Sequence, residues 1–292
     1  MLDLLPKCVI NMRFRAKVVD VGCIEQFTRV VSTISKMTQL CVLRLTADHM
    51  YFILNDKVAK GGIWCELAAS NFFDEYRMEG LSEESNEIYL EVTPEDIVRA
   101  MKTAQNAKAV KLKLTKKFSP CLTFDIELPS RTGHSRNVVH DVPVNVIPKS
   151  LWSEYTEPKV PDFDVSICMP PLKSLRNVVE RMKNLGSYLE LSANQNGEMR
   201  LRVESDQVTI STHFKELEIP EWINEGSETQ NQGRGPDQMV GAKVDIRRFL
   251  QFLAGQQLNP PKIICNIVNN RLIHFFLLQE DISLQYSMPI IQ

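Results

Sequence analysis

The residues of this sequence that could do chemistry are lysines and arginines on four amphipathic segments. In each segment, apolar residues recur at the spacing of one helical face, about 100° per residue. The basic side chains fall opposite that apolar face or on its flanks. They are Arg29, Lys36, Arg99, Lys102, Lys173, Arg176, Arg181, Lys183, Arg247 and Arg248. Cations on exposed helix faces can contact phosphates without reading base sequence, so the pattern favours binding to a nucleic-acid backbone.

The same pattern also fits ordinary solvated helix faces, and a single such helix would favour that interpretation. Four segments with the same bias shift the balance toward a surface that follows phosphates. No aromatic residue interleaves with the cations, which argues against stacking of single-stranded bases and favours a duplex. The net charge is only −2, which argues against a protein that is basic all over. The placement of charge, and not its total, carries the hypothesis.

Recognisable catalytic motifs are absent from the sequence. It contains no glycine-rich nucleotide loop, no Gly-x-Ser-x-Gly and no His-Glu-x-x-His. His140 and Asp141 are neighbours in an expected strand, so their side chains should face opposite sides. Glu83 and Glu84 lie in a polar loop and fit a solvated turn, because no further acidic ligands converge on them. We therefore expect no catalytic residue, no metal site, no cofactor and no enzymatic activity.

The cysteine pattern supports a reducing compartment. The chain has seven cysteines and five histidines, with no Cys-x-x-Cys pair and no cluster at metal-ligand spacing. Five cysteines sit in apolar runs and are expected to be free buried thiols: Cys23, Cys41, Cys65, Cys121 and Cys265. No apolar run approaches the ~20 residues of a membrane span. Residues 1–11 are too short and interrupted for a signal peptide and are interpreted as an extension outside the fold.

Three apolar patterns recur along the chain at nearly constant shifts. Ile24, Phe27, Val30, Val31 and Ile34 are matched 148 residues later by Leu172, Leu175, Val178, Val179 and Met182. Residues 97–104 are matched at 246–253 with a shift of 149, and the alternating run 122–128 at 272–278 with a shift of 150. The agreement of these shifts, in the same order, predicts two copies of one domain.

Each copy is expected to contain a strand, a helix, several strands, a second helix and further strands. The expected helices are residues 23–37, 94–105, 172–185 and 245–255. Strands outnumber helices, and short turns such as Asn196-Gly197 suggest antiparallel hairpins, so the predicted class is α+β. The predicted organisation is a domain at 12–146, a proline-containing connector at 147–163 and a second domain at 164–292. Residues 220–237 are interpreted as a surface loop.

Several longer strings resemble a known family. They are Met12-Arg-Phe-Arg-Ala-Lys17, Trp64-Cys-Glu-Leu67, Arg77-Met-Glu-Gly80, Ala100-Met-Lys-Thr-Ala-Gln-Asn-Ala107, Val139-His-Asp-Val-Pro143, Thr212-His-Phe-Lys215 and Phe249-Leu-Gln-Phe-Leu-Ala-Gly-Gln-Gln257. From Met12 to the C-terminus the sequence resembles the Hus-one subunits of the heterotrimeric nine-one-one checkpoint clamp. These belong to the family of sliding clamps that resemble the proliferating-cell nuclear antigen.

The resemblance implies an architecture and a role. It implies two copies of a sliding-clamp domain, with antiparallel sheets outside and four basic helices lining the hole of a ring. It implies a non-catalytic subunit that forms a heterotrimeric ring with two other clamp subunits, is placed on double-stranded DNA by a clamp loader and acts in the nucleus. The ring would encircle DNA at damage sites and recruit checkpoint-kinase activators and repair enzymes, without a membrane partner.

Two further sites follow from the resemblance. Rings of this kind close by pairing of edge strands, and by position the edges would be Val138–Asn145 and Gln207–Phe214. The candidate interface residues are Val138, His140, Val142, Val144, Val208, Ile210 and Thr212. The connector borders the pocket where client peptides dock on related clamps. Leu151, Trp152 and Tyr155 could form it, or could only fix the connector to the core.

Two alternatives stay open at this point. A homotrimeric replication clamp would share the fold and the basic helices. A metal-dependent nuclease with an unrecognised acidic site would belong to another class of protein, and Glu83 and Glu84 would be its first candidates.

Overall fold

The computed structural model describes residues 12–56, 61–129, 136–159, 161–220, 235–279 and 281–291. The chain divides into two units. Unit 1 comprises the described residues from 12–54 and 64–156, and unit 2 those from 55–63 and 157–291. The change from one unit to the other at residues 156–157 falls within the expected connector. The N-terminal extension and most of the expected loop at 220–237 lie outside the described residues.

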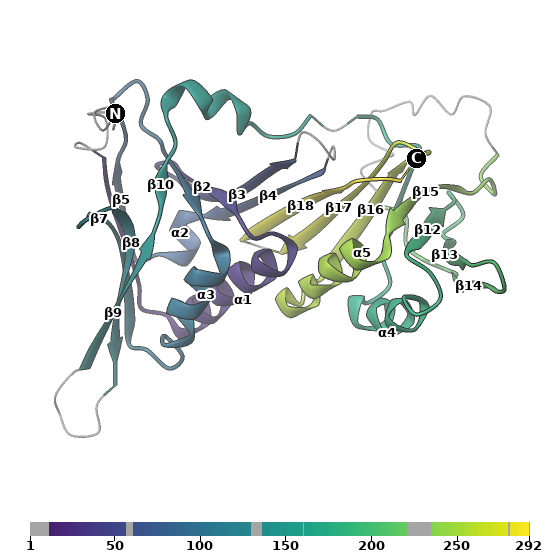
Figure 1. The fold of residues 1–292 in the computed structure, drawn as a ribbon, viewed down its shortest axis with the longest axis horizontal. Coiled ribbons are helices and arrows are strands. Elements are labelled where there is room, and N and C mark those ends of the chain that lie inside the picture. The colour runs from purple at the N-terminus through teal and green to yellow at the C-terminus, as the bar shows by residue number, and fades with distance from the viewer. Residues whose placement is uncertain are drawn as a thin grey trace. The chain divides into compact units, whose positions relative to one another are not determined.

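Unit 1 holds two layers of strands with helices packed against them (Figure 1). Its elements are β1 (Arg13–Val18), α1 (Val21–Met37), β2 (Cys41–Leu45), β3 (His49–Asp56), β4 (Gly61–Ala68), α2 (Ala69–Phe72), β5 (Glu75–Glu79), β6 (Ile88–Val92), α3 (Pro94–Lys102), β7 (Ala109–Lys116), β8 (Pro120–Leu128), β9 (Arg136–Pro143), β10 (Asn145–Val146) and the 3-10 helix η2 (Lys149–Glu154).

Unit 2 repeats the same succession with fewer elements. These are β11 (Val165–Cys168), α4 (Leu172–Met182), β12 (Tyr188–Ala193), β13 (Met199–Glu204), β14 (Thr209–Phe214), β15 (Val240–Asp245), α5 (Ile246–Phe252), the 3-10 helix η4 (Leu253–Leu258), β16 (Lys262–Val268), β17 (Leu272–Gln279) and β18 (Ile282–Met288).

The strand order confirms the internal repeat. In unit 1 the strands lie in the orders β5-β1-β7-β8-β9 and β10-β6-β2-β3-β4. In unit 2 they lie in the orders β11-β16-β17-β18 and β15-β12-β13-β14. With β5 and β10 set aside, each strand of unit 1 has its counterpart at the same place in unit 2. Antiparallel pairings occur in both units, for example Leu43↔Leu90 in unit 1 and Leu191↔Leu201 in unit 2. The predicted α+β class with antiparallel sheets is therefore confirmed.

Local sequence explains where the helices begin and end. Asp20 caps α1, because its carboxylate accepts a hydrogen bond from the Cys23 backbone N–H at 2.8 Å. Asp245 caps α5 in the same way, accepting from the N–H groups of Arg247 and Arg248. The helix expected at 245–255 instead tightens into η4 after Phe252. Asn259, in the left-handed conformation with φ of 48°, ends that turn.

Three elements of unit 1 were not predicted from the sequence: strand β5, helix α2 and the 3-10 helix η2, which lies in the expected connector. Strand β5 alternates half-buried Tyr76 and Met78 with charged residues, so its short run has little apolar content. Helix α2 has only four residues, too few to show a helical period. By contrast, Gly197 has φ of +78°, which confirms the tight turn expected between β12 and β13.

The cores of the two units are built from the apolar helix faces and the inward strand faces. In unit 1, Phe27 of α1 packs against Phe52 and Phe73, with ring centroids 6.4 and 6.2 Å apart. In unit 2, Phe252 of α5 stacks on Phe275 at 4.1 Å. Aromatic pairs of this kind add stability beyond the burial of their area, which fixes each helix in position.

Most of the cysteines are core residues. Cys41, Cys65, Cys121, Cys168 and Cys265 are free and buried. Burial raises the pKa of the thiols of Cys41, Cys65 and Cys265, so they stay protonated and unreactive. The expectation was wrong for Cys23, which is half-buried because it lies in the first turn of α1, and its Sγ donates to the carbonyl of Asn71 at 3.5 Å. Among the described residues, no helix is long and apolar enough to cross a membrane.

His274 makes the stability of unit 2 depend on pH. Its side chain is buried beneath Phe163 and Phe276, and Nδ1 lies 2.8 Å from the Ser287 hydroxyl. Burial lowers the pKa of His274 from 6.5 to about 4. Because the unfolded chain takes up this proton at a higher pH than the folded protein, stability falls as the pH drops from about 6.5 towards 4.

We predict that His274→Gln reduces the acid sensitivity of folding. Between about pH 7 and about pH 5 the wild-type protein should lose about 2 kcal/mol more unfolding free energy than the variant. Urea denaturation at the two pH values measures the difference. His213→Gln, at an exposed site in β14, is the matched control and should behave like the wild type. Equal pH dependence in both variants would contradict the assignment.

Candidate nucleic-acid interface

Helices α1 and α3 carry the predicted cations of unit 1. Helix α1 buries Ile24, Phe27, Val31 and Ile34, so the opposite face is left to solvent. The predicted cations Arg29 and Lys36 on α1, and Arg99 and Lys102 on α3, are all exposed. Lys36 and Lys102 stand in the last turns of their helices, where the helix dipole also favours a cation.

Helices α4 and α5 carry the predicted cations of unit 2. Leu175, Val179 and Met182 bury one face of α4, and Ile246 and Phe249 bury one face of α5. The exposed cations on the other side are Lys173, Arg181, Lys183, Arg247 and Arg248, and Arg176 is half-buried. Within each unit, the structure therefore buries the helix faces that the sequence predicted to be apolar and leaves most of the predicted cations exposed.

Some of these cations are neutralised by their own helices. Arg29 pairs with Glu25 at 3.3 Å and Arg99 with Asp96 at 3.1 Å. Glu180 contacts both Arg176 and Lys183, and the hydrogen bond from Lys183 holds the pKa of this carboxylate below its usual range. Such exposed pairs contribute little to stability, so the cations can exchange them for a phosphate at small cost.

The remaining cations have no anionic partner among the residues that the structure describes. They are Lys36, Lys102, Lys173, Arg181, Arg247 and Arg248. They are spread over all four helices, so every helix offers at least one charge that is not compensated within the described chain. Flexible cations of this kind suit contacts to phosphates, which carry no sequence information.

The two strands expected at a subunit interface lie at sheet edges. Strand β9 ends one sheet of unit 1 and β14 ends one sheet of unit 2, so each has a row of backbone groups with no neighbouring strand in the described chain. Ile210 and Thr212 lie on β14, and Val208 directly precedes it. Val208 and Ile210 are 46% and 38% exposed, and Thr212 is half-buried. Exposed apolar residues beside an open edge suit pairing with another chain.

The residues selected on β9 point inward. Val142 is buried and Val138 is half-buried, and Val144, which directly follows β9, is also buried. His140 is also half-buried, with its Nε2 2.9 Å from the hydroxyl of Thr103. The outward positions are the odd-numbered ones, among which Val139 is 54% exposed. Any pairing through β9 would therefore use the backbone and residues such as Val139, which sequence reasoning missed.

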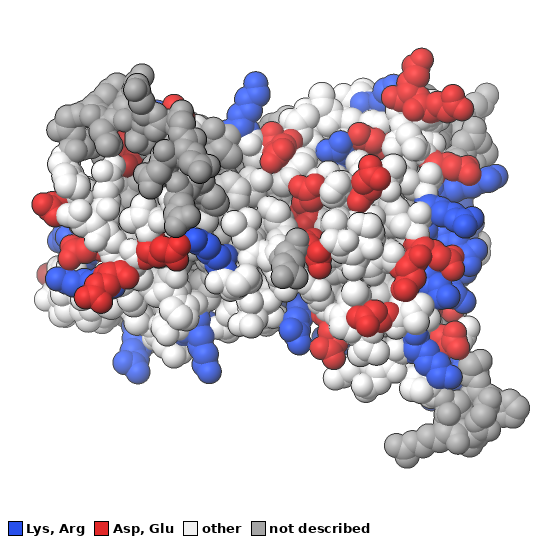
Figure 2. Space-filling model, turned by 180° about the vertical axis from the view of Figure 1, so that it is seen from behind, with Lys and Arg blue, Asp and Glu red and all other residues white. Residues whose placement is uncertain are grey.

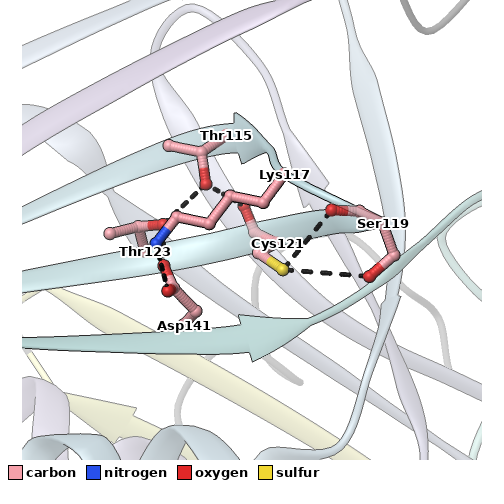
Figure 3. A network of polar contacts seen from close by, with 6 residues as sticks. All are labelled: Thr115, Lys117, Ser119, Cys121, Thr123 and Asp141. Carbon is pink, nitrogen blue, oxygen red and sulfur yellow. Dashed lines mark hydrogen bonds and ion pairs between the residues drawn. The ribbon is translucent and has the colours of Figure 1, made fainter.

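Asp141 lies on the outward face of β9 and has a structural role (Figure 3). Its carboxylate accepts hydrogen bonds from Thr123 Oγ1 at 2.6 Å and from Lys117 Nζ at 2.5 Å. Both hydrogen bonds lower the pKa of Asp141, and the one from Lys117 has the larger effect. The network links β9 to β8 and to the preceding hairpin, and it lies on the face opposite His140. His140 and Asp141 thus do not form a catalytic pair.

The three candidate pocket residues separate into two groups. Trp152 stacks on Tyr89 with centroids 4.6 Å apart and donates from Nε1 to the carbonyl of Ile147 at 3.0 Å. Tyr155 packs on the same cluster, with its ring 6.3 Å from that of Tyr89. Only Leu151 is exposed, at 42%. Trp152 and Tyr155 therefore fix η2 to the core of unit 1, and Leu151 is the one of the three whose side chain faces solvent.

The acidic pair in the polar loop gains no further ligands. Glu83 and Glu84 are both exposed in the loop between β5 and β6. Within the described ranges, no three His, Cys, Asp or Glu residues converge in a way that could hold a metal ion.

The arrangement of strands and helices defines the class of protein. The structure is similar to the proliferating cellular nuclear antigen of Entamoeba histolytica, with a TM-score of 0.70 over 96% of this chain and 99% of that chain, at 12% sequence identity. The chain thus has the sliding-clamp fold. The Hus1-like protein family matches residues 12–292, and the chain belongs to this family.

Curated relatives span nearly the whole chain. The checkpoint protein HUS1 of Homo sapiens is 52% identical over 280 residues, covering 95% of this chain and 99% of the relative. The checkpoint protein hus1 of Schizosaccharomyces pombe is 29% identical over 267 residues, covering 90% of this chain and 91% of the relative. The family match begins at Met12, where the resemblance was expected to begin.

We predict that Trp152→Ala destabilises the protein by about 2 kcal/mol, because it removes an aromatic stack and leaves the Ile147 carbonyl without its donor. Leu151→Ala, at the exposed neighbouring position, should change the unfolding free energy by less than about 0.5 kcal/mol. Chemical denaturation of both variants tests the assignment. Similar losses for the two would show that Trp152 does not anchor the connector.

Proposed function

We propose that this protein is a non-catalytic subunit of a heterotrimeric sliding clamp that encircles duplex DNA and acts in the DNA-damage checkpoint. The observation that carries the proposal is the repeated pair of helices with apolar faces buried and uncompensated cations exposed, in a chain of the Hus1-like family. The curated relatives are named as checkpoint proteins, which supports the checkpoint role.

The chemistry of the helices fits a ring that moves along DNA. Lysine and arginine side chains bind phosphates through charge, and phosphates are alike at every step of a duplex. Contacts of this kind hold the protein near the backbone without a preferred sequence. Since exposed ion pairs exchange readily, such contacts can break and re-form as the ring slides.

The open edges support assembly with other clamp chains. Strands β9 and β14 each leave one row of backbone donors and acceptors unpaired in the described chain. Two different partner subunits would satisfy these rows and close the ring by antiparallel pairing. In this assembly the protein serves as a scaffold in the nucleus, placed on DNA by a clamp loader, and it recruits checkpoint-kinase activators and repair enzymes.

The two alternatives differ in measurable ways. A homotrimeric replication clamp would form a stable trimer from this chain alone on gel filtration. A nuclease would show metal-dependent turnover by the purified protein. The similarity to the proliferating cellular nuclear antigen of Entamoeba histolytica is at the level of the fold, whereas the family match favours the heterotrimeric checkpoint ring.

We predict that reversing four helix charges, Lys36→Glu, Lys102→Glu, Arg176→Glu and Arg248→Glu, weakens duplex binding by the loaded ring on the order of a hundredfold at low salt. Each lost phosphate contact should reduce the slope of log K against log salt by about 0.9. The matched control reverses four exposed cations away from the helices, Lys108, Lys116, Lys243 and Arg271.

Titrations of labelled duplex at several salt concentrations measure both quantities. The control should keep most of the affinity, because its charges lie away from the helix faces. An unchanged affinity in the helix variant, or an equal loss in the control, would contradict binding through these faces.

A further inference from the structure

A second basic surface lies on the opposite side of unit 1 from helices α1 and α3. In the sheet β5-β1-β7-β8-β9, the inward residues, such as Phe14 and Leu112, are buried. The outward residues of β5, β1 and β7 are mostly charged: Glu75, Arg77, Glu79, Arg13, Arg15, Lys17, Lys111 and Lys113. Figure 2 shows Lys and Arg side chains gathered along the right-hand edge, where this sheet lies.

The strand register places three of these cations in one row. Arg15 of β1 lies directly opposite Arg77 of β5 on one side and Lys113 of β7 on the other. Adjacent strands are about 4.8 Å apart, so the three residues leave the sheet within about 10 Å of one another. We call Arg77, Arg15 and Lys113 the cation row. Like charges directly opposite each other destabilise a sheet, so this arrangement is not explained by stability.

The cation row is incompletely neutralised. Lys113 has one contact to Asp125, at 3.7 Å. Arg15 and Arg77 are exposed and form no ion pair with any residue in the described ranges. The neighbouring cations of β1 differ, because Arg13 pairs with Glu79 at 3.6 Å and Lys17 with Glu75 at 3.9 Å. Along β1, the uncompensated Arg15 is thus bordered on both sides by compensated pairs.

We propose that the cation row is a binding site for a single phosphorylated side chain, a phosphoserine or phosphothreonine in a partner peptide. A phosphate monoester carries a charge of about −1.5 to −2 and three acceptor oxygens, which suits two guanidinium groups and one ammonium group. The bordering carboxylates of Glu75, Glu79 and Asp125 disfavour an extended polyanion. Duplex DNA carries a negative charge about every 1.7 Å along its axis and would bring further phosphates against them.

The test uses fluorescein-labelled peptide libraries with a fixed central phosphothreonine flanked by random residues. The same libraries with threonine or glutamate at the centre serve as references. The full-length protein should bind the phosphothreonine library at least about tenfold more tightly than either reference in fluorescence polarisation. The double variant Arg15→Gln/Arg77→Gln should lose this preference.

Arg13→Gln/Lys17→Gln is the matched control, since it removes the same amount of charge from the same face of the sheet, at positions that are already paired. It should keep the preference for phosphate. Thermal denaturation should show no loss of stability in Arg15→Gln/Arg77→Gln, because the change relieves like-charge repulsion. The proposal is overturned by absence of phosphate preference in the wild type, by equal loss in both variants, or by unfolding of the Arg15→Gln/Arg77→Gln variant. Weaker binding of duplex DNA by that variant would also overturn it, in favour of a nucleic-acid surface.

Discussion

The structure depends on the burial of one face of every helix against the strands of its own unit. Phe27 and Ile34 on α1, and Phe249 and Phe252 on α5, are almost fully excluded from water. This burial stabilises the helices, and α3, α4 and α5, with 9, 11 and 7 residues, are too short to be stable alone. It also determines what the opposite faces can carry, because only those faces are free to hold charge. The position of the exposed cations is therefore a consequence of how the core is packed.

The sequence predicted the parts of the fold that have a clear period. The apolar spacing in residues 24–34 and 172–182 located two helices, and the constant shifts between patterns predicted a repeat that the strand orders confirm. Periodicity failed where elements are short or polar. Strand β5 is held by pairing with β1, through contacts such as Arg15↔Arg77, and neither strand shows this partnership in its own sequence.

The candidate site residues could be placed from the sequence only where their position depends on local sequence. The cations on the helices could be placed because a helical wheel needs only local sequence. The role of Trp152 could not, because Tyr89, on which it stacks, is far away in the chain. The residues that were predicted at the β9 edge alternate along the strand, but they belong to the set whose side chains face inward. Val142, for example, packs into the core. The alternation of charged and apolar residues in Arg13-Phe14-Arg15 is visible in the sequence. That Arg15 forms a row with two other cations is seen only when the strands β5, β1 and β7 are aligned.

We propose that this chain closes a ring with two different clamp subunits through its open edges. Native mass spectrometry of complexes purified on the tagged protein tests it most directly. The account predicts a complex with one copy of this chain and one copy each of two other clamp-like chains. It also predicts that Val208→Lys/Ile210→Lys, at the β14 edge, lowers the yield of that complex, while Tyr188→Lys, at an exposed site on interior strand β12, does not. A trimer of this chain alone, or a monomer that copurifies with no clamp-like chain, would contradict the account.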